Sequence, residues 1–170
     1  MSNQSIIQDV FSLARNETQL TGQVSVASLT RLHRDLSDQT GVLTYRVVGR
    51  VGDKTNLFID ITIDGSMNMV CQRCLEPVSQ LVAVDNTLQL VESEDELDNE
   101  EEELAAILAG DNSPEKIVGA KEFNIFDLLE DEVILSLPMS VTHDICDKQL
   151  PMSVGEKASP FDALLKLKPK

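Results

Sequence analysis

The stretch VLTYRVVGRVGDKTNLFIDITID, residues 42 to 64, alternates apolar and polar side chains in two runs that a short turn separates. In the second run the isoleucines stand two residues apart, at Ile59, Ile61 and Ile63. Successive side chains of a β-strand point to opposite faces, so this period indicates a strand with one buried face. The intervening VGDKT supplies turn residues, and the stretch therefore predicts a β-hairpin with strands at 42–51 and 55–64.

The sequence that follows this hairpin predicts further strands. Asp64-Gly65 is a frequent hairpin turn, so residues 66–72 are expected to return as the next antiparallel strand. Residues 78–91 are rich in valine and leucine and predict another strand, and residues 117–120 are a candidate for one more. The expected fold class is α+β, with an antiparallel sheet of about four to six strands that helices flank. An open sheet and a barrel-like closed sheet are both compatible with this pattern.

Helical spacing of apolar residues marks the N-terminal part of the chain. Residues 6–13 and 26–36 place apolar side chains three or four positions apart. We therefore expect residues 1–40 to form a helical segment that belongs to the same domain as the rest. Residues 41–170 are expected to form a single α+β domain.

Two further helices are predicted in the C-terminal third of the chain. Residues 122–138 have apolar side chains close to one helical face, Asn124 is suited to cap the helix, and Pro138 ends it. Asp127 stands at the third helical position, where a carboxylate completes a capping interaction. Residues 159–170 begin with Ser-Pro and end in lysines, a pattern that predicts a short amphipathic helix.

The charge is concentrated in one segment. The chain has a formal net charge of −15, and residues 92–103 hold nine acidic residues and no basic one. Runs of like charge repel one another and stay solvated, so we expect a disordered acidic insert, a flexible loop at 92–113. The overall acidity disfavours binding to a phosphate backbone, which depends mainly on lysine and arginine.

The cysteines and the absence of long apolar runs bear on the compartment. Three cysteines are an odd number, which argues against a disulfide framework and favours a reducing cytosol. No signal-like segment and no run of eighteen apolar residues is present, so neither export nor a membrane partner is expected. We therefore expect a cytoplasmic protein.

Two short motifs offer metal-ligating side chains. CQRCLEP, residues 71–77, places Cys71 and Cys74 two residues apart, and HDIC, residues 143–146, does the same with His143 and Cys146. Both motifs directly follow predicted elements, so they are able to meet as a Cys3His set of the kind that binds Zn²⁺. A turn with free thiols is an alternative. A thioredoxin-like redox pair fits less well, because it requires a helix N-terminus in a βαβ unit.

No motif for an enzyme accompanies these cysteines. The sequence lacks the glycine-rich, nucleophile-elbow and zinc-protease motifs that indicate nucleotide binding or hydrolysis, and no small-molecule substrate is evident. Four basic residues lie in predicted strands and turns and are candidates for contact with RNA or with a partner, with ordinary surface charge as the alternative: Arg46, Arg50, Lys54 and Arg73.

Several motifs in the same order resemble the YceD family of large ribosomal RNA subunit accumulation proteins. They are CQRCLEP after a hairpin, an acidic insert, FNIFDLLEDEVILSLPMSVTHDIC at 123–146 and PFDALLKLK at 160–168. The resemblance covers roughly residues 40–170. It implies a role in accumulation of 23S ribosomal RNA and in biogenesis of the large subunit, without catalysis. The expected partners are ribosomal RNA or the ribosomal proteins of pre-50S particles.

The resemblance also bears on the cysteines. Many family members carry a pair that matches Cys71, Arg73 and Cys74, and a second cysteine-rich cluster after the long helix. In this chain the second cluster is reduced to His143 and Cys146. Two other classes of function remain open at this point: a small metal- or redox-active protein centred on Cys71 and Cys74, and an interaction module whose acidic segment mimics nucleic acid.

Overall fold

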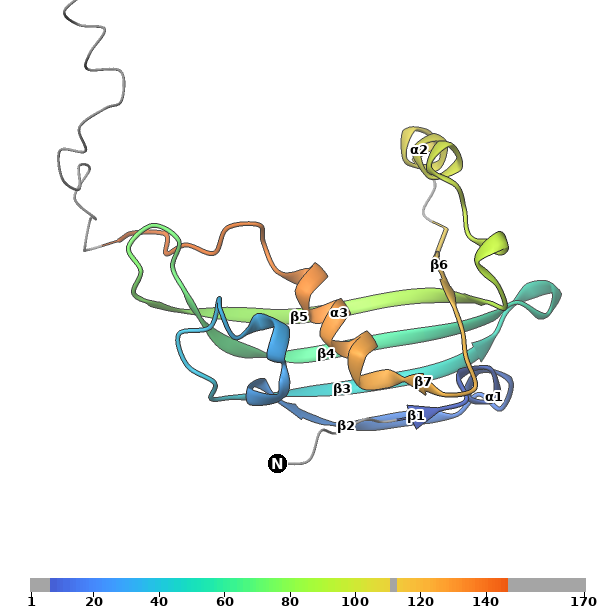
Figure 1. The fold of residues 1–170 in the computed structure, drawn as a ribbon, viewed down its shortest axis with the longest axis horizontal. Helices are drawn as coiled ribbons and strands as arrows, with labels where there is room; N and C mark the ends of the chain where they lie inside the picture. The colour runs from blue at the N-terminus through green and yellow to red at the C-terminus, as the bar shows by residue number, and fades with distance from the viewer. Residues whose placement is uncertain (1–6, 111–112, 147–170) are drawn as a thin grey trace, which may run out of the picture.

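A computed structural model of the chain describes residues 7–110 and 113–146. Its centre is a five-stranded sheet with the order β2-β3-β4-β5-β6 (Figure 1). Neighbouring strands are antiparallel except for β5 and β6, which are parallel. The strands are β2 (Gln19–Ser25), β3 (Val42–Val51), β4 (Leu57–Val70), β5 (Pro77–Val91) and β6 (Glu115–Val118). The sheet does not close into a barrel, and the expected α+β class is confirmed.

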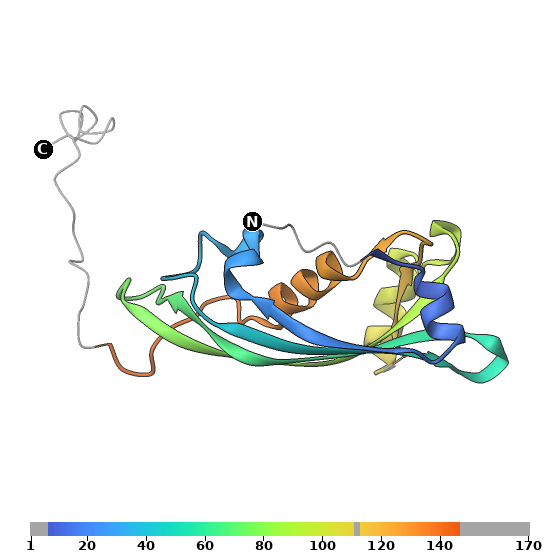
Figure 2. The same cartoon turned by 90° about the horizontal axis from the view of Figure 1, so that it is seen from below.

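Helices cover one face of this sheet. Helix α1 (Val10–Arg15), helix α3 (Ile125–Ser136) and two 3₁₀ turns lie on the same face (Figure 2). None of the described helices covers the opposite face, which we call the bare face. A two-stranded ribbon of β1 (Ile7–Gln8) and β7 (Phe123–Asn124) brings the start of the chain to the start of α3. The core lies between the sheet and these helices, and Ile59, Ile61 and Ile63 are fully buried in it.

The hairpin predicted from residues 42–64 is present. β3 pairs with β4 from Thr44 opposite Asp64 to Val51 opposite Leu57, and the connection holds a 3₁₀ turn at Asp53–Thr55. Side chains of β4 alternate between core and bare face as the sequence indicates. The predicted strand at 78–91 corresponds to β5, and the short strand expected at 117–120 corresponds to β6.

The hairpin predicted at Asp64-Gly65 is wrong, because β4 runs through it as one strand of 14 residues. The alternation continues in phase across the glycine: Met67 and Met69 are buried on the same face as Ile63. Gly65 is needed for a close approach, since a Cβ at this position would lie 2.6 Å from the side chain of Leu43. The true turn between the two long strands lies at residues 71–76.

The N-terminal helical segment was predicted only in part. α1 overlaps the second half of the expected helix at 6–13, where Ile7–Gln8 instead form β1. Residues 26–36 contain two 3₁₀ turns, Val26–Ser28 and Thr30–Leu32. Between them and α1 lies β2, which the sequence analysis missed. Its alternating pattern is weak because Gly22 takes one of the three inward positions and leaves only Leu20 and Val24 as apolar signals.

Helix α3 confirms its predicted start and end. The side chain of Asn124 accepts a hydrogen bond from the Phe126 N–H at 3.1 Å, and the helix stops two residues before Pro138. Arg31 ties the 3₁₀ region to this helix, since its Nε donates to the buried carboxylate of Glu130 at 2.8 Å. Its guanidinium also reaches Asp131 at 2.6 Å.

The acidic segment contains more local structure than the predicted disordered insert. It forms a 3₁₀ turn at Glu94–Glu96 and helix α2 (Glu100–Ala109), whose first N–H groups donate to the side chain of Asn99. α2 stands apart from the sheet, with Leu104 and Leu108 exposed (Figure 1). The helix predicted at 159–170 lies outside the described residues. Within the described part of the chain, no helix has the length and apolarity needed to cross a membrane.

Packing of α1 on β3 depends on Gly49, and Gly49→Ala is expected to destabilise the fold. A Cβ there would lie 2.2 Å from the Leu13 carbonyl oxygen, and main chain does not move aside cheaply. We expect a loss of about 1–3 kcal/mol in the free energy of unfolding, measured by denaturant titration. Gly22→Ala is the control, because it meets the movable side chain of Tyr45. Equal losses in both variants would contradict this account.

A second prediction concerns Glu132, a carboxylate of α3 that is 6% exposed. Burial raises its pKa, Asn86 lowers it by a hydrogen bond, and the nearby Glu115 and Asp131 raise it further. The folded state therefore holds this proton more tightly than the unfolded state does, so stability declines as the pH rises above the ordinary glutamate range. Glu132→Gln should raise the denaturation midpoint at pH 7.5 but not at pH 4. The exposed Glu122→Gln serves as the control, and a gain independent of pH would count against this assignment.

A candidate metal centre at the end of the sheet

The turn between β4 and β5 presents two cysteines. Within it the Cys71 N–H donates to the Glu76 carbonyl at 3.0 Å, and the Leu75 N–H donates to the Cys71 carbonyl at 2.9 Å. Leu75 adopts a positive φ of 62°, which lets the chain reverse in this short space. The turn holds Cys71 and Cys74 on its inner side, where they are 0% and 3% exposed.

The loop that follows α3 lies against this turn. The Gln72 N–H donates to the carbonyl of Val141 at 2.9 Å, and the Val141 side chain is buried. Arg73 reaches across and donates to the carbonyl groups of His143 and Asp144. These bonds fix the second motif beside the first, although about 70 residues of chain separate them.

The four expected ligands meet at this point. Their ligand atoms, one each from Cys71, Cys74, His143 and Cys146, lie within 4.8 Å of one another. The Sγ atoms of Cys71 and Cys146 are 3.7 Å apart, and Cys74 Sγ is 3.4 Å from His143 Nδ1. In a tetrahedral site of sulfur and nitrogen ligands, neighbouring donor atoms lie about 3.5–3.8 Å apart. The arrangement thus has the size of a tetrahedral metal site, and all three cysteines are free.

The histidine is oriented for ligation by a main-chain contact. His143 Nε2 lies 3.0 Å from the carbonyl oxygen of Pro77. A carbonyl oxygen only accepts, so Nε2 carries the proton and Nδ1 presents its lone pair to the three sulfur atoms. Ligating histidines commonly donate their second ring nitrogen in this way, which fixes both tautomer and ring orientation.

The three thiols lie close enough to change one another's pKa. Burial raises the pKa of Cys71, but main-chain N–H groups of His143, Arg73 and Cys74 outweigh this effect and bring the pKa to about 5. For Cys74 an N–H bond from Glu76 lowers the pKa, whereas burial and the neighbouring Cys71 and Cys146 sulfurs raise it above its ordinary value. A bound cation would remove this mutual repulsion, since it favours the thiolate at every ligand.

Arg73 supplies part of the missing positive charge. Its Nε donates to Cys146 Sγ at 3.0 Å, a contact that raises the pKa of the arginine. The same sulfur, together with that of Cys71, raises the pKa of His143. The sequence predicts Arg73 only as a contact for RNA or a partner and does not assign it to this centre. Its position between two cysteines was the available signal.

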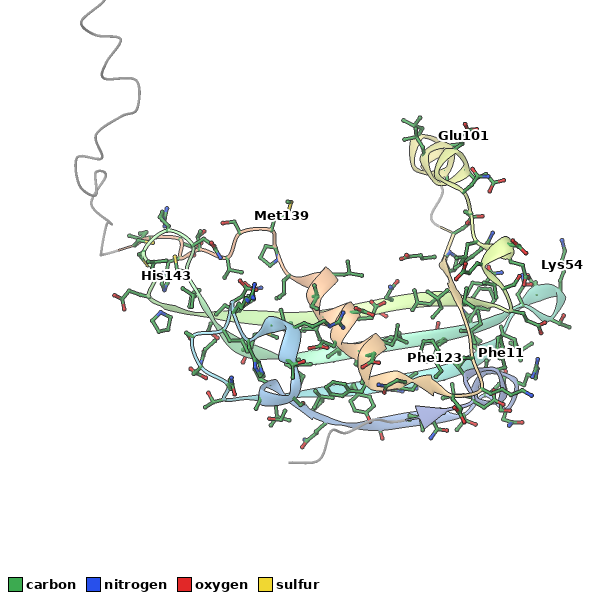
Figure 3. The ribbon with its side chains drawn as sticks, in the orientation of Figure 1. Phe11, Lys54, Glu101, Phe123, Met139 and His143 are labelled. Atoms are coloured by element: carbon green, nitrogen blue, oxygen red, sulfur yellow. The ribbon has the colours of Figure 1, made fainter. Side chains whose placement is uncertain are left out.

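The four basic candidates do not form one patch. Lys54 lies at the opposite end of the sheet from His143 (Figure 3), and Arg73 lies beside His143. Arg50 forms an ion pair with Asp60 at 3.1 Å and covers the ring of Phe58. Arg46 lies on the same strand face as Arg50, opposite Thr62 of β4. Three of them thus follow one another along β3 and the turn after it, and Arg73 lies apart from them.

Comparison with known proteins identifies the family. The family model described as large ribosomal RNA subunit accumulation protein YceD matches residues 59–168. This range includes most of β4, all of β5 and α3, and both motifs of the metal centre. Neither the curated proteins nor the solved structures gave a match. The match covers well over half of the chain, and the protein belongs to the YceD family.

Proposed function

We propose that this protein is a non-enzymatic factor that supports accumulation of 23S ribosomal RNA and biogenesis of the large ribosomal subunit in the cytoplasm. The observation that carries the proposal is the family match, which spans the long β4–β5 hairpin, α3 and the cysteine-rich centre. The family description names accumulation of the large ribosomal RNA subunit. The partner and the manner of binding are parts of the proposal.

We further propose that the centre holds a structural Zn²⁺. Three thiolates and one imidazole are a donor set that suits zinc, and the distances among them fit a tetrahedral ion. All four positions of such an ion would be filled by protein ligands. Catalytic zinc sites leave a position open for water or substrate, so this closed set favours a structural role over the metal- or redox-active alternative.

Binding to a protein partner has more support than binding to RNA through the basic candidates. Arg50 is already paired with Asp60, and Arg73 is engaged with Cys146 and two carbonyl groups. Asp64 and Asp85 add negative charge on the bare face of the sheet. With a net charge of −15, the surface attracts basic ribosomal proteins and repels exposed phosphates.

The zinc assignment predicts one ion per chain, measured by native mass spectrometry of purified protein. Cys71→Ser and Cys146→Ser should lose the ion and unfold at a lower temperature, because a buried tetrahedral site contributes its binding energy to folding. His33→Gln is the matched control, since His33 is the other histidine of the chain and contacts the Ala27 carbonyl instead. Full stability of metal-free protein, with three titratable thiols, would exclude the structural role.

The ribosomal role predicts that the protein sediments with particles lighter than the mature large subunit in sucrose gradients at low salt. Depletion of the protein should lower the level of 23S ribosomal RNA relative to 16S. If contacts with a protein dominate, the association should weaken only gradually with salt, whereas contacts with several phosphates produce a steep loss. Sedimentation solely at the top of the gradient, with unchanged RNA levels, would refute the proposed function.

A further inference from the structure

The outer edge of β5 is unpaired over most of its length. β6 pairs with β5 only from Leu88 to Val91. Along residues 78–87 the described part of the chain provides no strand on this side. Besides the bonds to β4, two described side chains bond to main-chain groups here: Gln80 donates to the Leu81 carbonyl, and Asn86 accepts from the Thr87 N–H. The N–H and C=O groups that point outward from alternate residues therefore offer a template for another strand.

This edge lacks the features by which proteins usually protect an open edge. Residues 77–84, PVSQLVAV, contain no charged side chain, and the one proline stands at the first position of the strand. Leu81 is 70% exposed at the middle of this run. Natural edges are normally blocked by lysine, by proline within the strand, or by a covering segment. Along residues 78–84 of the described structure no lysine, no internal proline and no paired strand blocks the edge, which indicates an edge that is used.

Exposed apolar side chains accompany the edge. Helix α3 packs over β5, and the loop after it passes on the outer side of β5 (Figure 1). Leu135, near the end of α3, is 75% exposed, and Met139 in the loop is fully exposed and points away from the sheet (Figure 3). With Leu81 on the bare face, apolar contacts are available on both sides of an added strand, whose side chains alternate between the two faces.

Acidic groups bound the other end of the open edge. Asn86, at this end, donates to the buried carboxylate of Glu132 at 3.1 Å. No described basic side chain forms an ion pair with Glu132. The acidic helix α2 lies on the same side of the sheet, beyond β6 (Figure 1). An occupant of this edge thus enters a negative field, to which Glu132 contributes without an ion-pair partner among the described residues.

We propose that residues 78–86 of β5 bind an extended, lysine- or arginine-rich peptide segment of a partner protein as an additional β-strand. Main-chain bonds to the open edge provide register, apolar residues of the peptide contact Leu81 and Leu135, and its cations complement Glu132 and α2. The inference rests on the proposed function and deepens it, because it assigns the basic partner to one surface. A second copy of this acidic chain is disfavoured by charge, and RNA offers no strand edge.

The test uses the full chain and a synthetic peptide of nine residues in which lysine and valine alternate. Binding is measured by calorimetry, and amide hydrogen exchange is followed residue by residue. Strand addition should slow exchange at alternate residues between 78 and 86, and Leu81→Lys should weaken binding about tenfold or more, because it places charge in the contact. Leu81 is mostly exposed, so this variant keeps the fold, which thermal unfolding checks.

Matched controls separate the edge from general charge attraction. Val42→Lys makes the same kind of change at an exposed strand residue of β3 and should leave binding unchanged. A peptide with glutamate in place of lysine should not bind, and a peptide methylated on alternate main-chain nitrogens should lose the protection of β5. Peptide binding that perturbs only residues 92–109, with no protected amide in β5, would overturn the proposal.

The remaining outcomes identify other occupants and also overturn it. Slow exchange along residues 78–86 without peptide indicates a second copy if it depends on concentration, and a segment of the same chain if it does not. Sedimentation distinguishes this inference from the proposed function. If Leu81→Lys travels with pre-50S particles as the wild type does and the peptide does not bind, the inference alone fails. If the peptide binds β5 but the wild type does not sediment with these particles, the proposed function alone fails.

Discussion

The antiparallel ladder between β4 and β5 is the constraint on which the rest of the structure depends. It consists of fourteen residue pairs, from Leu57 opposite Leu90 to Val70 opposite Pro77. One face of the ladder supplies the buried aliphatic side chains against which α3 packs. β3 pairs with the edge of β4 that faces away from β5. Because the strands are long, the turn that joins them lies far from the end that holds α1 and Lys54. The cysteine-rich centre forms where that turn meets the loop after α3.

The position of the centre follows from the length and direction of α3. This helix begins beside β7 and runs over the sheet toward the β4–β5 turn, so the loop after Pro138 arrives where Cys71 and Cys74 lie. The Gln72 to Val141 bond and the Arg73 contacts close the gap between the two segments. These contacts hold the three thiols and the imidazole of the cysteine-rich centre side by side. A cation in that space would couple the end of α3 to the hairpin.

Much of this fold follows from local sequence pattern, and the errors have identifiable causes. Alternation predicts β3 and the first part of β4, a run rich in valine and leucine predicts β5, and an asparagine cap with a terminal proline predicts α3. Asp64-Gly65 wrongly predicts a hairpin because the pair is typical of turns, whereas the alternation of side chains continues through it to Met67 and Met69. Gly65 makes room for the side chain of Leu43 instead. The helix expected at 26–36 gave way to 3₁₀ turns that Arg31 ties to α3.

The four side chains of the candidate metal centre were predictable from the sequence, but their supporting contacts were not. Spacing alone brings out Cys71 with Cys74 and His143 with Cys146, because two residues between ligands suit one ion. The roles of Pro77 and Arg73 depend on a tertiary arrangement, since a carbonyl group and a guanidinium have no spacing signature. The register that places them is set by the long pairing of β4 with β5, which shares only Pro77 with the two motifs.

The negative net charge of the chain affects which partners approach the open edge of β5. An edge segment without charged side chains and with an exposed leucine invites association between copies of the same chain, and residues 77–84 of β5 form such a segment. A charge of −15 on every copy opposes that encounter at long range, while the same field draws a basic chain toward the edge. The acidic segment at 92–103, beside the end of β5, then has a physical role that needs no contact of its own. It makes an edge that is unprotected by its own side chains selective for partners of opposite charge.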